Sequence, residues 1–377
     1  MSNSPVYPRR RCTFVVAVLC LSLLCLITTG LLSLSNLSLP TSSQAADQLD
    51  DLEKARLSEA FHLKETLGDT IWPGWGRAHI PTLLWNEEYA FLIGHSAPPA
   101  GWSEVEGDAF QGQPYYRQRW SDPKAFPVLV GDRWVASMSV KTWTQLSLQE
   151  QIQDDLPPAL KPIFPYRLVL RRYTSDWHIA ALLHESFHAY QAEVALARFE
   201  DAQRAYRDET LYKSIDLAMR EAWQREIDLL IQAVQATSDA EAAELACRFL
   251  HQRVQRRQEQ GLDPALIAYE RRLEWLEGLA KYVELTSWRE ASAPAYEPLP
   301  DLVPDPDFHD YTLFQQRWSQ ELKQMKRQAS REGDSRFYYT GMAQAVLLDR
   351  LAPGWKARIL SENAWLEELL NEAVTSY

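Results

Sequence analysis

The longest apolar stretch of the chain lies near its N-terminus, where no charged residue occurs between Arg11 and Asp47. As a helix rising about 1.5 Å per residue, residues 12–34 are long enough to cross a hydrocarbon core about 30 Å thick. A cleaved signal peptide usually has a shorter apolar region, although Ser43 and Ala45 are small residues that suit signal peptidase. We therefore expect a transmembrane anchor over 12–34, with a cleaved signal peptide as the alternative.

The three consecutive arginines at positions 9–11 set the orientation expected for this span. Basic residues flank the cytoplasmic side of membrane spans, so residues 1–11 are predicted to be cytoplasmic. The rest of the chain is then expected on the extracytoplasmic side, held at the membrane by this span, or secreted if the segment is cleaved. Residues 35–69 are expected to form a juxtamembrane spacer with a short helix.

Strand-type patterns dominate residues 70–174. Residues 82–95 are rich in β-forming residues and are followed by a cluster of prolines and glycine. Residues 126–140 contain a glycine–aspartate pair between two apolar stretches, which is typical of a hairpin. Residues 166–173 are predicted to form one more short strand. These segments together predict a small antiparallel sheet.

Helical periodicity replaces this pattern from residue 175 to residue 377, and Thr174 or Ser175 can cap the first helix. A sheet followed by helices predicts an α+β protein whose mainly helical part binds a metal. After the first helix, further helices are expected at 208–236, 239–260, 264–290, 308–331 and 336–351.

Composition and charge restrict the possible functions. Hydrophobic residues make up 46% of the 377 residues, which is enough for a packed core. The net charge of −12 argues against a nucleic-acid-binding protein, because no basic surface offsets phosphate repulsion. Three of the four cysteines lie in or beside the apolar stretch, so no disulfide is expected within the rest of the chain. The sequence does not predict an oligomeric state.

The candidate chemistry is carried by HESFH, at residues 184–188. In a helix, His184 and His188 stand one turn apart on the same face and can direct two imidazoles at one Zn²⁺ ion. Glu185 is rotated about 100° from His184, so it misses the metal but can serve as general base for a metal-bound water. A helix with two histidines and an unrelated glutamate is the alternative. A catalytic zinc also needs a third protein ligand.

The stretch LEGLAKYVE, at residues 276–284, resembles the NEGFAxYxE segment of aminopeptidase-N-like gluzincins, a class of zinc metallopeptidases. The resemblance implies that Glu277 is the third zinc ligand, and that the fold is zincin-like, as in thermolysin-like enzymes. Gly278, which also matches the segment, would let a second helix approach closely. Residues 189–276 separate the two motifs, and the family's GxMEN exopeptidase sequence is absent. The resemblance therefore implies a gluzincin without implying aminopeptidase specificity.

Two other glutamates on the second motif helix are candidates for a supporting role. Glu274 and Glu284 are expected to orient a ligand histidine by hydrogen bonding, and Glu274 is also the alternative third ligand. A solvated helix face with paired charges is the other interpretation of the same spacing.

A hydrogen-bond donor for the developing oxyanion is also needed for amide hydrolysis. Tyr338 and Tyr339, directly before a predicted helix, are the candidates, together with His309. The helix that follows them has the leucine and valine spacing of an ordinary core helix.

These observations predict a zinc-dependent peptidase, exported or anchored in the membrane, that acts on a peptide or protein substrate. A non-catalytic zincin-fold binding or structural membrane protein is the alternative. A zinc hydrolase acting on a non-peptide bond is a third interpretation.

Overall fold

The computed structural model describes residues 20–24, 27–31, 33–34, 36–39, 47–119, 126–206, 216–361 and 364–376. Contacts divide the chain into two compact units. One consists of Met1–Gln44 and Val140–Thr174, and the other of Ala45–Ser139 and Ser175–Tyr377. Each unit is described separately below.

The expected membrane span over 12–34 lies partly outside the described residues. In the part of the chain that the structure describes, no helix is long and apolar enough to cross a membrane. The structure thus contradicts the transmembrane part of the predicted fold and the membrane localisation derived from it.

The smaller unit is helical where it is described, with η1 (Asn36–Ser38), α3 (Lys141–Asp155), η2 (Lys161–Ile163) and α4 (Tyr166–Leu170). The strand predicted over 166–173 is therefore wrong. Its aromatic and branched residues favour a strand, but the backbone after Pro165 closes helical bonds instead, from Val169 N to Pro165 O at 3.3 Å. Helix α3 also lies within the region predicted to be rich in strands.

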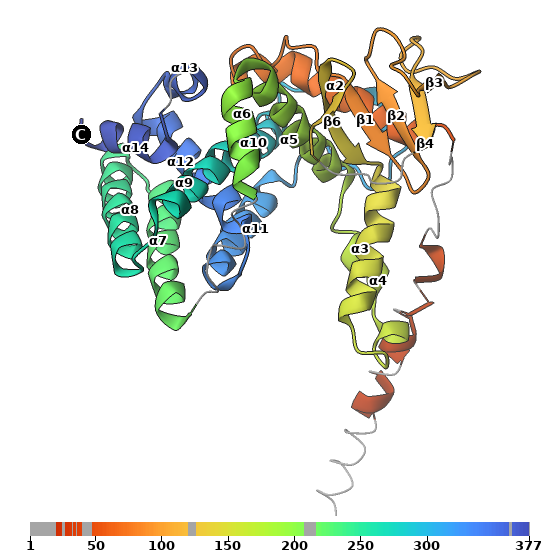
Figure 1. The fold of residues 1–377 in the computed structure, drawn as a ribbon. Helices are drawn as coiled ribbons and strands as arrows, with labels where there is room; N and C mark the ends of the chain where they lie inside the picture. The colour runs from red at the N-terminus through yellow and green to blue at the C-terminus, as the bar shows by residue number, and fades with distance from the viewer. Residues whose placement is uncertain are drawn as a thin grey trace, which may run out of the picture. The chain divides into compact units, whose positions relative to one another are not determined.

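The larger unit contains one six-stranded sheet, in the order β3-β4-β2-β1-β6-β5 (Figure 1). Neighbouring strands are antiparallel except β1 and β6, which are parallel. The sheet is thus mixed, and the prediction of a purely antiparallel sheet is wrong. Strand β6 returns after a long connection to lie beside the first strand in the same direction. The strands are β1 (Thr82–Trp85), β2 (Tyr89–Ile93), β3 (Ser103–Glu104), β4 (Tyr116–Arg119), β5 (Val128–Val130) and β6 (Arg133–Ser139).

The hairpin predicted at Gly131-Asp132 is confirmed. Val130 pairs with Arg133 across a two-residue turn between β5 and β6. Gly131 has a φ of +63°, and a tight hairpin turn requires such a positive φ. Strand β5 forms one edge of the described sheet.

The helices of the larger unit agree with the predicted periodicity in most segments. Helix α8, for example, spans Asp239–Glu259, and the Ser238 side chain caps it by accepting from Glu241 N. The helix expected within 35–69 is longer than predicted, and Asp50 caps it. Besides α8, the elements are α2 (Asp51–Ile71), α5 (Ser175–Val194), α6 (Leu196–Ala205), α7 (Leu217–Gln235), α9 (Pro264–Leu273), η4 (Glu274–Gly278), α10 (Leu279–Ala291), η5 (Pro300–Leu302), α11 (Phe314–Arg327), η6 (Gln328–Ser330), α12 (Ser335–Leu351), α13 (Trp355–Ser361) and α14 (Leu366–Val374).

Helix α5 is the central element of the larger unit. It packs against β6 on one side and against α10 and α2 on others (Figure 1). Fifteen of its twenty residues are buried, as expected for a helix in this central position. The helix that carries the HESFH motif is thus enclosed by sheet and helices rather than exposed at the surface.

A buried network of arginines and glutamates joins α7, α8, α9, η4 and α14. Arg253 donates to Glu226 at 2.8 Å and holds both oxygens of Glu274, at 2.6 and 2.9 Å. No side chain of the network is more than 8% exposed, so each charge depends on its partners rather than on water. Its members are Arg253, Arg256, Arg257, Glu226, Glu270, Glu274 and Glu367.

Removing the central arginine should destabilise the larger unit strongly. We expect Arg253→Met to lower the free energy of unfolding by about 3–5 kcal/mol, because it leaves buried carboxylates unpaired. Urea denaturation measures the change. Arg350→Met is the control, since Arg350 pairs with Asp239, whose side chain is 56% exposed, and should cost about 1 kcal/mol or less. Equal losses in both variants would contradict this view of the network.

The network should also make stability depend on pH. Burial alone raises the pKa of Glu367, but the charges of Arg253 and Arg257 lower it to about 2. Since the pKa is lower in the folded than in the unfolded chain, the stabilisation is complete above pH 4.5 and is lost as pH falls towards 2. As the pH falls from 4.5 to 2, the free energy of unfolding of the wild type should fall by about 3 kcal/mol more than that of Glu367→Gln.

Urea denaturation at a series of pH values tests this expectation. Glu372→Gln is the control, because Glu372 lies on the same terminal helix but its side chain is 59% exposed. Parallel pH profiles for the wild type and Glu367→Gln would refute it.

Candidate metal centre

One face of α5 carries both histidines of the HESFH motif. His184 and His188 are four residues apart, so their imidazoles leave the helix one turn apart on the same side. On an adjoining face, the rings of Trp72 and Trp75 pack on Phe187, at centroid distances of 4.8 and 6.0 Å. This packing fixes the rotation of α5 about its axis and therefore the direction of both histidines.

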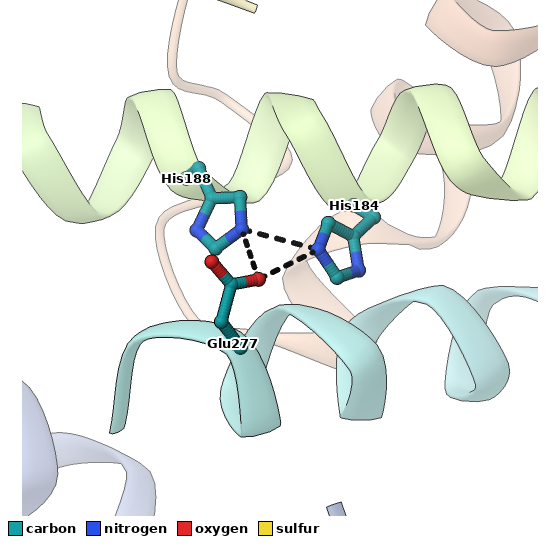
Figure 2. A group of neighbouring side chains, drawn as sticks. All are labelled: His184, His188 and Glu277. Carbon is teal, nitrogen blue, oxygen red and sulfur yellow. Dashed lines mark hydrogen bonds and ion pairs between the residues drawn. The ribbon is translucent and has the colours of Figure 1, made fainter. Parts of the chain in front are cut away.

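Glu277 reaches the histidines from η4, a single π-helical turn between α9 and α10. Such turns are frequent at functional sites. Figure 2 shows the Glu277 carboxylate directed from this turn towards both imidazoles. A Cβ added to Gly278 would lie 2.5 Å from Gly341 Cα, so this glycine permits the close approach of α12. The close helix contact expected at Gly278 is thereby confirmed.

Three potential ligand atoms converge at one point. His184 Nε2 and His188 Nε2 are 3.1 Å apart, and Glu277 Oε2 lies 3.4 Å from the first and 3.1 Å from the second. In a tetrahedral zinc site with bonds of about 2.0–2.1 Å, ligand atoms are about 3.3–3.4 Å apart. The spacing therefore fits one ion bound to all three atoms, and within the described residues these three side chains form a group that could hold a metal ion.

The partners of the outer ring nitrogens determine which atoms face the centre. His188 Nδ1 lies 2.9 Å from Gln191 Oε1, and the Gln191 amide nitrogen donates to Trp275 O at 2.9 Å. His184 Nδ1 lies 3.3 Å from a carboxylate oxygen of Glu284. Gln191 Oε1 can only accept, so the proton of a neutral His188 ring belongs on Nδ1, whereas His184 Nδ1 has no hydrogen bond within the described residues. The Nε2 lone pair of His188 then points at the lone pairs of Glu277, an arrangement that a cation satisfies.

The charges around the centre are consistent with a site for a cation. Burial alone lowers the pKa of His184, but the neighbouring carboxylates of Glu277 and Glu284 raise it to about 10. Burial alone raises the pKa of Glu277, yet the neighbouring histidines lower it below its ordinary value. Glu284 is held in turn by Lys281 Nζ at 2.6 Å. The carboxylates around the centre thus favour positive charge there, on an imidazole or on a bound cation.

Two tyrosines lie beside the ligand carboxylate. The Tyr206 hydroxyl donates to Glu277 Oε1, the oxygen that does not face the histidines. The Tyr338 ring stacks on His184 with centroids 6.1 Å apart, and its hydroxyl lies near enough to Glu277 for that charge to raise its pKa further after burial. Burial raises the pKa of both tyrosines, so both hydroxyls remain protonated donors. Sequence analysis did not identify Tyr206, because it belongs to no motif and reaches Glu277 only through the fold.

Glu185 lies on the same helix turn as the histidines and has a different environment. Its Oε2 atom is buried and has no hydrogen-bond partner within the described part of the chain. Burial raises the pKa of this carboxyl, and the nearby histidines oppose that rise. A buried acceptor without a partner is costly, and it marks a place where a polar ligand or water is needed.

Three other predicted site residues lie elsewhere. Glu274 is bound to Arg253 and accepts from Thr340 Oγ1 at 2.6 Å, so it is neither a third ligand nor a partner of a histidine. Burial raises the pKa of Tyr339, and the charges of Glu321 and Glu284 add to this effect, so its hydroxyl lies near these carboxylates rather than near Glu277. His309 is exposed in the loop before α11.

Comparisons with protein-family models, curated proteins and solved structures found no match to this chain. The resemblance of residues 276–284 to gluzincins therefore depends on the two motifs alone. The geometry of the His184, His188 and Glu277 cluster is independent of that resemblance.

If the cluster holds zinc, the hydrogen bond from Tyr206 should strengthen metal binding. We expect Tyr206→Phe to weaken zinc affinity by about 10-fold to 100-fold, because a ligand carboxylate loses the partner that orients it. Competition with a chromophoric chelator measures this affinity. Tyr296→Phe is the matched control, since Tyr296 also donates to a buried carboxylate, that of Glu59 at 2.8 Å. Unchanged affinity in Tyr206→Phe would contradict the assigned role.

Proposed function

We propose that this protein is a zinc-dependent hydrolase of gluzincin type that cleaves peptide bonds. The observation that carries the proposal is the convergence of two imidazole Nε2 atoms and one carboxylate oxygen beside a buried, unpartnered Glu185 oxygen. A site that only binds a metal does not need the additional carboxylate. The LEGLAKYVE resemblance supports the same reaction class.

His184, His188 and Glu277 would hold the ion, with Gln191 and Glu284 fixing the two rings. A bound zinc ion polarises a carbonyl group and lowers the pKa of water that it coordinates to about 7. Glu185 then acts as the general base that takes a proton from the attacking water. The same carboxyl returns this proton to the nitrogen of the leaving amine.

The developing oxyanion needs a donor that is already in place. Tyr338 and Tyr206 have protonated hydroxyls beside Glu277, which supports this role for one of them. Tyr339 is not retained as a candidate, because the charges that act on its hydroxyl are those of Glu321 and Glu284 and not that of Glu277.

An extended peptide is supported as the substrate by the strand nearest the cluster. The ring of Phe126, directly before β5, lies 5.3 Å from the His188 ring and 6.2 Å from the Tyr206 ring. Because β5 is an edge strand of the described sheet, its outer backbone groups can pair with an extended chain. Phe126 would then contact an apolar side chain of that peptide.

A non-catalytic metal-binding protein is the second candidate. One observation favours it: His188 and Glu277 are each only 1% exposed, and His184 is 7% exposed. A catalytic zinc keeps one position open to water or substrate, whereas a structural zinc is closed. A hydrolase acting on a non-peptide bond uses the same residues and would differ in substrate only.

Replacing the base tests catalysis separately from metal binding. We expect zinc-loaded wild type to cleave a mixed peptide library and Glu185→Gln to lose at least about 100-fold of that rate, since the amide cannot accept the proton. Zinc content should be equal in both proteins. Mass spectrometry of the library and metal analysis of the proteins provide the two measurements.

Glu193→Gln is the matched control, because Glu193 is an exposed glutamate on the same helix α5. It should cleave the library at the wild-type rate, and a chelator should abolish that cleavage. Zinc bound equally by all three proteins, with cleavage by none of them, would favour the non-catalytic candidate.

A further inference from the structure

A cavity lies in the larger unit, on the side of α5 away from the histidines. Its volume is about 520 Å³, within the range of sites that bind small molecules. Helix α2, the segment after it, the first two strands and α5 all contribute to its walls. Ser186 lines it, and Ser186 is rotated about 200° from His184 around the helix. The cavity is therefore separate from the candidate metal centre.

A buried lysine forms part of the wall of this cavity. Lys64 is 8% exposed, and its Nζ donates to Ala78 O at 2.5 Å and to Gly76 O at 3.3 Å. These two carbonyls use two of the three N–H donors of the ammonium group, and Nζ also lies 5.8 Å from the centroid of the Trp75 ring. Within the described residues no carboxylate lies at ion-pair distance from Lys64 Nζ, although the more distant charges of Asp69, Glu193 and Glu65 act on it. Buried charges are normally paired, so a lysine without a close carboxylate at a cavity wall is unusual.

The other side chains of the cavity divide into an apolar interior and a polar mouth. Ile80, Ile93, Leu182 and Leu183 line it and are buried, while polar residues such as Gln111 line it and are exposed. The Ser186 hydroxyl is buried and has no hydrogen-bond partner within the described chain. In the buried interior a ligand would meet the Lys64 ammonium, the Ser186 hydroxyl and aliphatic side chains, whereas the charged side chains of Glu65 and Arg77 line the exposed mouth.

We propose that this cavity binds a small amphipathic monocarboxylate, with its carboxylate on Lys64 and its apolar chain against the aliphatic residues of the interior. A single carboxylate matches the single buried ammonium, whereas a phosphate dianion would need further cations at the same depth. Ser186 supplies a second donor for the carboxylate. The site is independent of the metal and of the proposed peptidase activity.

Calorimetric titration of the full chain with octanoate tests the proposal. We expect Lys64→Met to weaken octanoate binding by at least about tenfold, because a hydrogen bond to a charged group is lost, and Ser186→Ala to weaken it less. Lys54→Met is the matched control, since Lys54 lies on the same helix but pairs with Asp108 outside this cavity. It should bind octanoate as the wild type does.

Two further measurements keep the test decisive. Binding should persist after divalent metals are removed with a chelator, whereas a carboxylate bound to the metal centre would be lost. Octan-1-ol lacks the charge and should bind the wild type at least about tenfold more weakly than octanoate. This comparison uses only the wild type, so it tests the proposal even if Lys64→Met does not fold. The proposal would be overturned if octanoate and octan-1-ol bound equally, or if Lys64→Met bound octanoate as well as the wild type does. It would also be overturned if a chelator abolished binding, or if octanoate did not bind at millimolar concentration.

Discussion

The position of the π-helical turn η4 is the constraint on which the candidate site depends. It brings the carboxylate of Glu277 to within 3.1 Å of His188, which lies 89 residues earlier in the chain. One end of the turn is fixed by the ion pair between Glu274 and Arg253, and the other by the contact of Gly278 with Gly341. Because both anchors are buried, the carboxylate cannot turn away without breaking the packing of α12 and the arginine–glutamate network.

The electrostatics of the site follow from this placement. Glu185, Glu277 and Glu284 lie around two imidazoles whose Nδ1 atoms already face acceptors, so negative charge and lone pairs exceed the available protons. A divalent ion balances that excess, and a protonated imidazole does so only in part. The same residues therefore explain both the raised pKa of His184 and the fit of the ligand atoms to a tetrahedral ion.

Much of the site could be predicted from sequence because its components are local. The four-residue spacing of the histidines and the glutamate before Gly278 require only helices, and helical periodicity after residue 174 was strong. Contacts between distant segments were not predictable: Tyr206, Gln191 and Arg253 acquire their roles only when helices meet. The parallel pairing of β6 with β1 is likewise a long-range feature that strand patterns do not specify. Apolar length suggested a membrane helix, and the described residues contain none.

Anomalous X-ray diffraction at the zinc edge, on crystals of the zinc-loaded protein, tests the central claim most directly. We expect one anomalous peak within about 2.2 Å of His184 Nε2, His188 Nε2 and a Glu277 oxygen, with Glu185 outside the coordination sphere. A zinc peak at other residues, or no peak at this cluster when zinc is in excess, would contradict it.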